Sequence, residues 1–285
     1  MDPHKWPAPS EATQHRKPAS RRRLLSWAGG AVVAAAAGVG LVAAPPSRAA
    51  GVLLADGSDF SAPADTEWRP IRIGVFGDSL ADGIWAGLYR TLQRNERFEV
   101  ARHTEVSSGL ARPDFFDWEA ELGDVLASET IDVAVVCFGL NDNQPVYYEG
   151  RRQFSFASDE WNQVYTQRVA AFIDRLQQSG VPVFWVGLPT VRDDDFGAQM
   201  AHLNDIYATE ALLADATFVP TLAITADADG AYSAYLPDES GRNRLVRAND
   251  GVHFTGRGYE MIAKELLAAM QRELTYIVVD DSANG

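Results

Sequence analysis

The order in which strand-like and helix-like segments follow one another most limits the fold of this chain. Apolar runs occur at 71–77, 98–106, 131–139 and 181–189, and a helical pattern follows each of them. A shorter run at 216–221 leads through a polar segment into a closing helical pattern at 255–274. Strands that alternate with helices, several of them apolar throughout, predict a parallel sheet covered on both faces. Ligands bind beyond the carboxyl ends of the strands in such a sheet, so functional residues should lie in the loops there.

The first 49 residues differ in composition from the rest of the chain. Arg21–Arg23 precede an Ala-, Gly- and Val-rich run from Trp27 to Ala44, and a small-residue segment ends at Ala49. This layout is typical of a secretory signal, and the Ser-Arg-Arg-x-Leu-Leu order resembles a twin-arginine signal. We therefore expect a periplasmic or extracellular protein. The alternative is an uncleaved membrane anchor, because a run of this length is near the minimum for a membrane span. Residues 50–69 are interpreted as a linker, and residues 70–285 as the functional domain.

The charge balance excludes several classes of partner. Seven of the 25 Lys and Arg residues and two of the 39 Asp and Glu residues lie in the first 49 positions, so the remainder carries 18 against 37, a formal net charge of −19. Nucleic acids and anionic lipid surfaces would repel a domain with this charge. We therefore expect no nucleic-acid partner.

No cofactor or metal ion is expected from the motifs present. The single cysteine, Cys137, lies in an apolar run, so an intramolecular disulfide is excluded and a buried strand position is predicted. The segment from Thr225 to Leu236 resembles a calcium loop but lacks acids at its first and twelfth positions. The sequence has no zinc-ligand spacing and no phosphate-binding loop.

Polar residues and glycines follow the predicted strands at the points where a ligand site is expected. Ser79 follows the first strand, Gly109 the second and Asn141 the third, and Asp250 and His253 come just before the last helix. Each has an ordinary structural explanation: Ser79 as a helix cap, Gly109 and Asn141 as turn residues, and His253 as a surface histidine. Their ordered placement favours one shared catalytic site.

Four short blocks carry a resemblance to the SGNH hydrolases, also known as the GDSL family. The blocks are Gly77-Asp78-Ser79-Leu80, Gly109, Gly139-Leu140-Asn141-Asp142 and Asp250-Gly251-Val252-His253. The resemblance runs from about Ile71 to Leu274. It implies a three-layer α/β/α sandwich with a flavodoxin-like, parallel, five-stranded sheet. It is strongest to an exported bacterial subgroup, a domain of unknown function, that shares the strings GDSLADG and GLNDNQ.

The resemblance assigns a role to each block, and the chemistry agrees. Serine is a weak nucleophile that needs an adjacent base, so Ser79 pairs with His253, and Asp250 orients the imidazole. The family's oxyanion hole corresponds here to the backbone N–H groups of Ser79 and Gly109 and the side-chain amide of Asn141. A serine at a helix N-terminus also gains from the helix dipole.

The expected function is that of an exported serine esterase that removes O-acetyl or other short acyl groups from cell-envelope or extracellular polysaccharide. Two alternatives stay open. One is an O-acyltransferase that moves acetyl groups onto a glycan, working beside a membrane acyl-transfer partner. The other is a non-catalytic glycan-binding or assembly module.

Two further features bear on substrate contact. The guanidinium of Arg112 is a candidate for binding substrate, and a salt bridge to an acid such as Asp114 is an equally weighted explanation. Aromatic residues near the predicted site suit either sugar stacking or core packing, with packing favoured for most of them. They are Trp85, Phe115, Phe116, Trp118, Tyr147, Tyr148 and Trp161.

Overall fold

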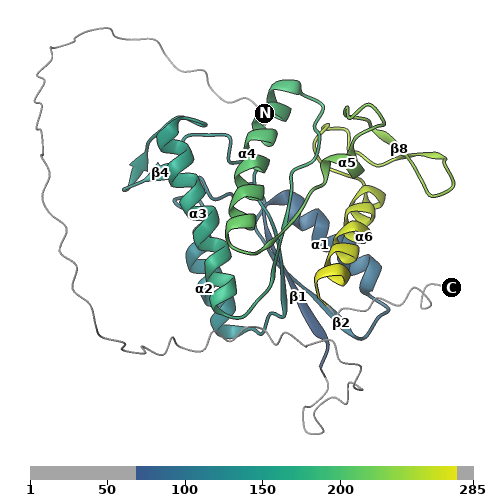
Figure 1. Cartoon of the computed structure of the whole chain (residues 1–285), viewed down its shortest axis with the longest axis horizontal. Helices are drawn as coiled ribbons and strands as arrows, with labels where there is room; N and C mark the ends of the chain where they lie inside the picture. Colours follow the sequence, from purple (N-terminus) through teal and green to yellow (C-terminus); the bar gives the residue numbers. More distant parts are fainter. Residues whose placement is uncertain (1–68, 275–285) are drawn as a thin grey trace, which may run out of the picture. The chain divides into compact units, whose positions relative to one another are not determined.

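The structure is a computed structural model that describes residues 69–274 (Figure 1). The predicted signal or anchor at 1–49, the linker up to residue 68 and the C-terminal residues 275–285 lie outside the described part. Within residues 69–274, no helix combines the length and apolar character that crossing a membrane requires.

Five parallel strands form the central sheet, in the spatial order β2-β1-β3-β6-β7. This order places β3 at the centre, between β1 and β6, and confirms the predicted flavodoxin-like arrangement. The strands are β1 (Ile71–Gly77), β2 (Phe98–Thr104), β3 (Val133–Cys137), β6 (Val183–Val186) and β7 (Thr217–Val219).

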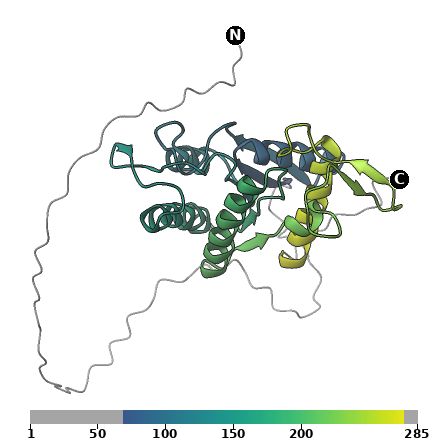
Figure 2. The same ribbon diagram turned by 90° about the horizontal axis from the view of Figure 1, so that it is seen from above.

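Helices cover both faces of the sheet. The pair α1 and α6 packs together on one face, whereas α3 and α4 lie side by side on the other (Figures 1 and 2). The helices are α1 (Ser79–Leu92), α2 (Trp118–Ser128), α3 (Asp159–Gln178), α4 (Asp194–Leu213), the short α5 (Leu222–Thr225) and α6 (Gly256–Glu273). The three layers agree with the predicted α/β/α sandwich.

The core between the sheet and α3 is rich in aromatic side chains. Phe172 of α3 meets Phe76 of β1 and Phe138, just after β3, edge to face, with ring centroids 6.2 and 5.3 Å apart. Every residue of β3 is buried, including Cys137 as predicted. A central parallel strand is enclosed on both faces, which explains why its sequence is apolar throughout.

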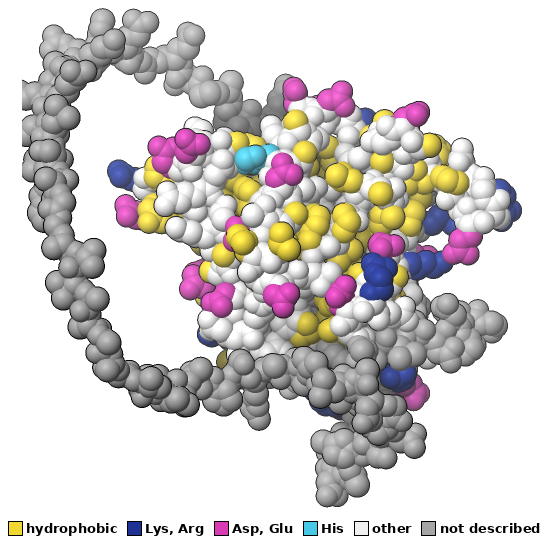
Figure 3. Space-filling model, in the orientation of Figure 1, with side chains coloured by type: hydrophobic (Ala, Val, Ile, Leu, Met, Phe, Trp, Pro, Cys, Tyr) yellow, Lys and Arg dark blue, Asp and Glu magenta, His cyan; other side chains and the backbone are white. Residues whose placement is uncertain are grey.

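Two small hairpins extend the basic fold near the carboxyl edge and the last helix. Along the chain, the first hairpin comes between β3 and α3 and consists of β4 (Tyr147–Tyr148) and β5 (Arg151–Arg152). The second comes before α6 and consists of β8 (Tyr235–Pro237) and β9 (Asn243–Leu245). Figure 3 shows acidic side chains scattered in small groups among hydrophobic and other side chains on the visible face, with several basic side chains toward the β8 side.

Candidate active site

The turn between β1 and α1 presents Ser79 at the carboxyl edge of the sheet. Gly77 ends β1 with φ +139°, and a Cβ there would lie 1.9 Å from the carbonyl oxygen of Cys137, so only glycine fits. Asp78 is the N-cap of α1, because its side chain accepts a hydrogen bond from Leu80 N at 2.9 Å. Ser79 is therefore the first helical residue. The alternative that Ser79 is the cap is wrong, and its hydroxyl is left available for another partner.

A continuous chain of hydrogen bonds links Ser79, His253 and Asp250. Ser79 Oγ lies 2.8 Å from His253 Nε2, and His253 Nδ1 lies 2.8 Å from Asp250 Oδ2. With the proton on Nδ1, the imidazole donates to Asp250 and accepts from the Ser79 hydroxyl through Nε2. This is the arrangement in which a histidine can take a proton from a serine nucleophile.

The Asp250 carboxylate also shapes the loop that carries His253. Its Oδ1 accepts hydrogen bonds from the backbone N–H groups of Val252 at 2.9 Å and His253 at 3.0 Å. Burial raises the pKa of Asp250, but these N–H groups and the imidazole outweigh that effect and hold it below its usual range. Asp250 is thus kept as an anion that can stabilise a positively charged imidazole.

The three predicted oxyanion donors lie at the same edge of the sheet, at the start of α1 and in the loops after β2 and β3. The N–H of Ser79 belongs to the first turn of α1, whose N–H groups have no partner inside the helix. Asn141 donates one amide hydrogen to the carbonyl of Ser108 at 2.8 Å. Among the described residues, neither its second amide hydrogen nor the N–H of Gly109 donates to an acceptor. Their function as oxyanion donors stays a prediction.

A buried carboxylate, Asp142, holds the Gly109 loop against the Asn141 loop. Asp142 Oδ1 accepts from the N–H of Ala111 at 2.7 Å, and Oδ2 accepts from the hydroxyl of Tyr165 at 2.6 Å. A Cβ on Gly109 would lie 2.2 Å from Asp142 Oδ1, so this approach requires glycine. Burial raises the pKa of Asp142, while the Tyr165 hydroxyl and the N–H donors lower it in part.

A second buried carboxylate, Asp78, joins the nucleophile turn to the loop after β3. Its Oδ2 accepts hydrogen bonds from the N–H groups of Gly139 and Leu140, both at 3.1 Å. Burial is the main reason that the pKa of Asp78 rises to about 7, and the charge of Asp142 adds to the rise. Asp78 and Asp142 therefore connect the three loops that carry the predicted oxyanion donors.

Asp78 and Asp142 belong to the motif blocks, but no role was predicted for them from the sequence. Both acids stand beside apolar runs, in GVFGD and CFGLND, and burial could have been read from those neighbours. A buried carboxylate requires several hydrogen-bond donors, and loop backbone N–H groups are the nearest ones. That combination indicates a carboxylate that organises loops.

Arg112 is engaged by other side chains in this structure. Its guanidinium forms two 2.6 Å hydrogen bonds with the carboxylate of Asp114 and contacts Gln144 Oε1 at 3.2 Å. The hydrogen bond to Asp114 raises the pKa of Arg112, and Arg112 lowers that of Asp114. The structural alternative, a salt bridge, is thus present. Contact of Arg112 with substrate stays a prediction that requires release from Asp114.

The seven aromatic residues named above divide into a buried or half-buried group and an exposed group. Most of them pack against other residues, as favoured from the sequence. Trp118 and Trp161 are buried, and Trp85, Phe116 and Tyr147 are half-buried. Phe115 and Tyr148 are exposed by 59% and 39% and are free to meet a ligand.

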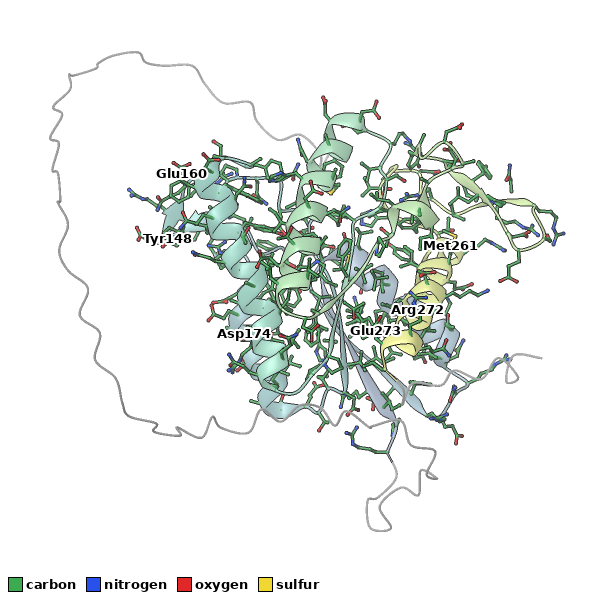
Figure 4. The ribbon with its side chains drawn as sticks, viewed as in Figure 1. Tyr148, Glu160, Asp174, Met261, Arg272 and Glu273 are labelled. Atoms are coloured by element: carbon green, nitrogen blue, oxygen red, sulfur yellow. The ribbon has the colours of Figure 1, made fainter. Side chains whose placement is uncertain are left out.

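A cavity of about 670 Å³ lies between α2 and α3 and includes Gly109 and Phe116 in its lining. Tyr148 and Asp174 also line it, and Figure 4 shows them well apart along the α3 side of the molecule. Neither Ser79 nor His253 lines this cavity. Within residues 69–274, no group of three or more metal-ligating side chains is assembled.

A family model described as "Protein of unknown function (DUF459)" matches residues 72–269. The chain belongs to this DUF459 family. The match spans the whole sheet apart from its first residue and includes every residue of the candidate site. A comparison with curated proteins finds no match to this DUF459 protein.

Solved structures share the fold of this DUF459 protein at low sequence identity. A GDSL-like lipase from Bacteroides thetaiotaomicron is 13% identical, with a TM-score of 0.52 over 73% of this chain and 93% of its own. An alpha/beta hydrolase enzyme from the metagenome of Lake Arreo, Spain, is 16% identical, with a TM-score of 0.53 over 70% and 94%. A member of the lipolytic G-D-S-L family from Veillonella parvula is 16% identical, with a TM-score of 0.50 over 70% and 98%. The predicted SGNH hydrolase fold is confirmed.

Proposed function

We propose that this protein is an exported serine esterase that removes O-acetyl or other short acyl groups from cell-envelope or extracellular polysaccharide. The observation that carries the proposal is the hydrogen-bonded chain from Ser79 through His253 to Asp250. It lies at the carboxyl edge of the sheet, where ligand sites of this fold class occur.

In the first half of the reaction, Ser79 Oγ attacks the ester carbonyl carbon and His253 Nε2 takes the hydroxyl proton. The carbonyl oxygen becomes an oxyanion, to which the N–H groups of Ser79 and Gly109 and the amide of Asn141 donate. The imidazolium, stabilised by Asp250, then protonates the leaving alkoxide as its bond to the acyl carbon breaks. The products are a free sugar hydroxyl and an acyl ester on Ser79.

In the second half, a water molecule replaces the alcohol. His253 Nε2 takes a proton from the water as its oxygen attacks the acyl carbon, and the same donors accommodate the second oxyanion. Collapse breaks the bond to Ser79 Oγ, which recovers the proton from His253. A carboxylic acid is released and the enzyme returns to its starting state.

The substrate class rests on location and on surface chemistry. The signal-like N-terminus favours a substrate outside the cytoplasm, where acylated glycans are abundant small-acyl esters. The exposed rings of Phe115 and Tyr148 offer faces on which sugar rings can stack. The negative domain charge suits a neutral acylated glycan better than a polyanion.

Purified full-length protein tests the proposal against acetylated xylan, acetylated peptidoglycan and aryl esters of acetyl, butyryl and octanoyl groups. We expect acetate release and faster cleavage of acetyl than of octanoyl esters, with both activities lost in Ser79→Ala. A protein that releases no acid from any of these, or whose Ser79→Ala variant keeps its activity, would contradict the proposal.

Addition of a deacetylated glycan acceptor separates hydrolysis from acyl transfer. An esterase releases acetate at the same rate with and without the acceptor, whereas a transferase places labelled acetyl groups on it. Both reactions pass through the acyl ester on Ser79, so only the second acceptor differs.

A further inference from the structure

Two arginines contact the loop that carries Asp250 and His253, Arg247 from the protein interior and Arg192 from the surface. We infer that Arg192 and Arg247, together with the ring of Tyr232, form a clamp that positions His253 and Asp250 against Ser79. The three clamp residues come from separate segments: Arg192 follows β6, Tyr232 precedes β8, and Arg247 follows β9. None of them belongs to the four blocks of the resemblance, and none contacts the predicted reacting atoms, so their role is positioning.

Arg247 is a buried cation without a carboxylate partner among the described residues. It is 1% exposed, and its Nη1 donates to the carbonyl of Val252 at 3.1 Å, beside His253. Its Nη2 donates to the carbonyl and hydroxyl of Thr190 at 2.6 and 2.9 Å and to the carbonyl of Thr225 at 3.2 Å. Burying a charged guanidinium among neutral acceptors costs desolvation free energy. We therefore expect the buried position of Arg247 to serve a function. Fixing the carbonyl beside the catalytic histidine is such a function.

Aromatic rings complete the environment of Arg247. Its guanidinium carbon lies 3.8 Å from the ring centroid of Phe254 and 5.2 Å from that of Tyr232. Burial lowers the pKa of Arg247 to about 10, so the side chain still carries its charge at neutral pH. The ring faces replace part of the electrostatic stabilisation that a carboxylate would supply.

Arg192 holds the other side of the same loop from the protein surface. Its backbone N–H donates to the carbonyl of Gly251 at 2.9 Å, and its Nη1 donates to the carbonyl of Asn249 at 2.9 Å. Its Nη2 lies 3.3 Å from the hydroxyl of Tyr232, and its guanidinium carbon is 5.4 Å from that ring centroid. Tyr232 is thus the shared contact between the two arginines.

Together these contacts occupy most of the carbonyl groups in the loop. Asn249 and Gly251 are bound by Arg192, Val252 is bound by Arg247, and the carbonyl of His253 accepts from Ala248 N at 2.9 Å. A loop held at four of its carbonyl groups has little freedom to rotate. The imidazole of His253 therefore keeps the position in which its Nε2 meets Ser79 Oγ. Misplacing a catalytic group by about 1 Å can reduce a rate about 100-fold.

The clamp rests on the proposed esterase function for its effect on rate, but its effect on the loop can be measured without activity. We would compare Arg192→Ala, Arg192→Lys, Tyr232→Leu and Arg247→Lys in the full chain. Arg242→Ala is the matched control, because Arg242 is an exposed arginine in the turn between β8 and β9 that pairs with Asp238. Two readouts are taken: kcat and KM on an acetyl aryl ester, and hydrogen exchange of the backbone amides of Val252 and His253.

For Arg192→Ala and Tyr232→Leu we expect kcat to fall about 10- to 100-fold while KM changes less than about twofold. Exchange at Val252 and His253 should quicken about tenfold, because the loop opens more often. Arg192→Lys should recover part of both effects, since an ammonium can still donate to the Asn249 carbonyl. Arg242→Ala should match the wild type.

Arg192 is exposed, so its variants test the clamp even if Arg247→Lys fails to fold. If Arg192→Ala shows the same loop exchange and the same kcat as Arg242→Ala, the clamp is refuted. If the wild type hydrolyses no ester, the proposed function fails. The hydrogen-exchange data then decide by themselves whether the clamp residues restrain the loop.

Discussion

The hydroxyl of Ser79 and the imidazole Nε2 of His253 lie 2.8 Å apart, although 174 positions separate the two residues in the chain. The contact forms because β1 and the loop before α6 both end at the carboxyl edge of the sheet. A contact of this kind allows an imidazole to activate a serine hydroxyl. The imidazole of His253 in turn lies 2.8 Å from Asp250 Oδ2.

Replacing His253 by Gln should remove the base while keeping a polar side chain of similar size. We expect kcat for ester hydrolysis to fall by a factor on the order of 10⁴, with little change in thermal stability. His202→Gln is the control, because His202 is a half-buried histidine of α4 that bonds Asn162 instead. Steady-state kinetics on an acetyl aryl ester checks both variants, and equal losses in the two would remove the special role of His253.

Asn141→Ala should lower kcat by about 100- to 1000-fold, equivalent to about 3 kcal/mol of transition-state stabilisation. KM should change little, because the amide acts on the oxyanion more than on the bound ester. The matched control is Asn143→Ala, two positions along the same loop, whose amide donates to Gln199. A loss that appears in KM alone would assign Asn141 to substrate binding.

Gly109→Ala should destabilise the protein and reduce activity together. The added Cβ would meet Asp142 Oδ1 at 2.2 Å, and that oxygen is already held by the N–H of Ala111. We expect a loss of about 1–3 kcal/mol in the free energy of unfolding, as for other overpacked sites. Urea denaturation and steady-state kinetics measure the two effects.

Gly123, inside α2, provides the contrast to Gly109, because an alanine at position 123 should be tolerated. The nearest atom to its added Cβ would be Arg175 Nη2, at 3.9 Å, so the methyl group fits. Alanine favours a helix interior over glycine by about 1 kcal/mol, and the variant should gain up to that amount. If both glycine variants behaved alike, the close approach of Asp142 would not be the cause of the Gly109 effect.

Asp78 should make the stability of the protein depend on pH. Burial raises its pKa from 3.8 to about 7, so between these values the folded protein holds a proton that the unfolded chain releases. Its contribution to the free energy of unfolding therefore falls as the pH rises through this window, and stays constant above it. At about 1.4 kcal/mol per unit, the full change is about 4 kcal/mol.

The comparison with Asp78→Asn isolates this effect, because an amide does not titrate. Urea denaturation at several values from about pH 4 to about pH 8 gives the stability difference between wild type and variant. We expect the free energy of unfolding of the wild type to fall relative to that of Asp78→Asn as the pH rises. A difference that stays constant across the window would show that Asp78 has an ordinary pKa.

The sheet and the order of its elements can be predicted from the sequence, because burial determines which positions along each strand and helix are apolar. A strand enclosed on both faces must be apolar at every position, as in β3, and the long helices keep their apolar residues on one side. The helical pattern predicted after the apolar run at 131–139 corresponds to α3, which begins after the N-cap Ser158. The small hairpins β4–β5 and β8–β9 were not predicted, because strands of two or three residues carry almost no periodicity.

The candidate site can be predicted only in part from the sequence. Ser79, Asn141, Asp250 and His253 were predicted to share one edge of the sheet, and the structure places them there. The salt bridge from Arg112 to Asp114 was one of two explanations that the sequence offered. The partners of Asp78, by contrast, lie 61 and 62 positions away, at Gly139 and Leu140. Such pairings leave no spacing pattern in one sequence.

Covalent catalysis by Ser79 can be tested with a serine-reactive phosphonate and intact-mass measurement. We predict one adduct per chain in the wild type, located on the peptide that contains Ser79, and no adduct in Ser79→Ala. Ser128→Ala, which removes an exposed hydroxyl bonded to Asp124 at the end of α2, should label like the wild type. An unlabelled wild type, or an adduct that persists in Ser79→Ala, would contradict the account.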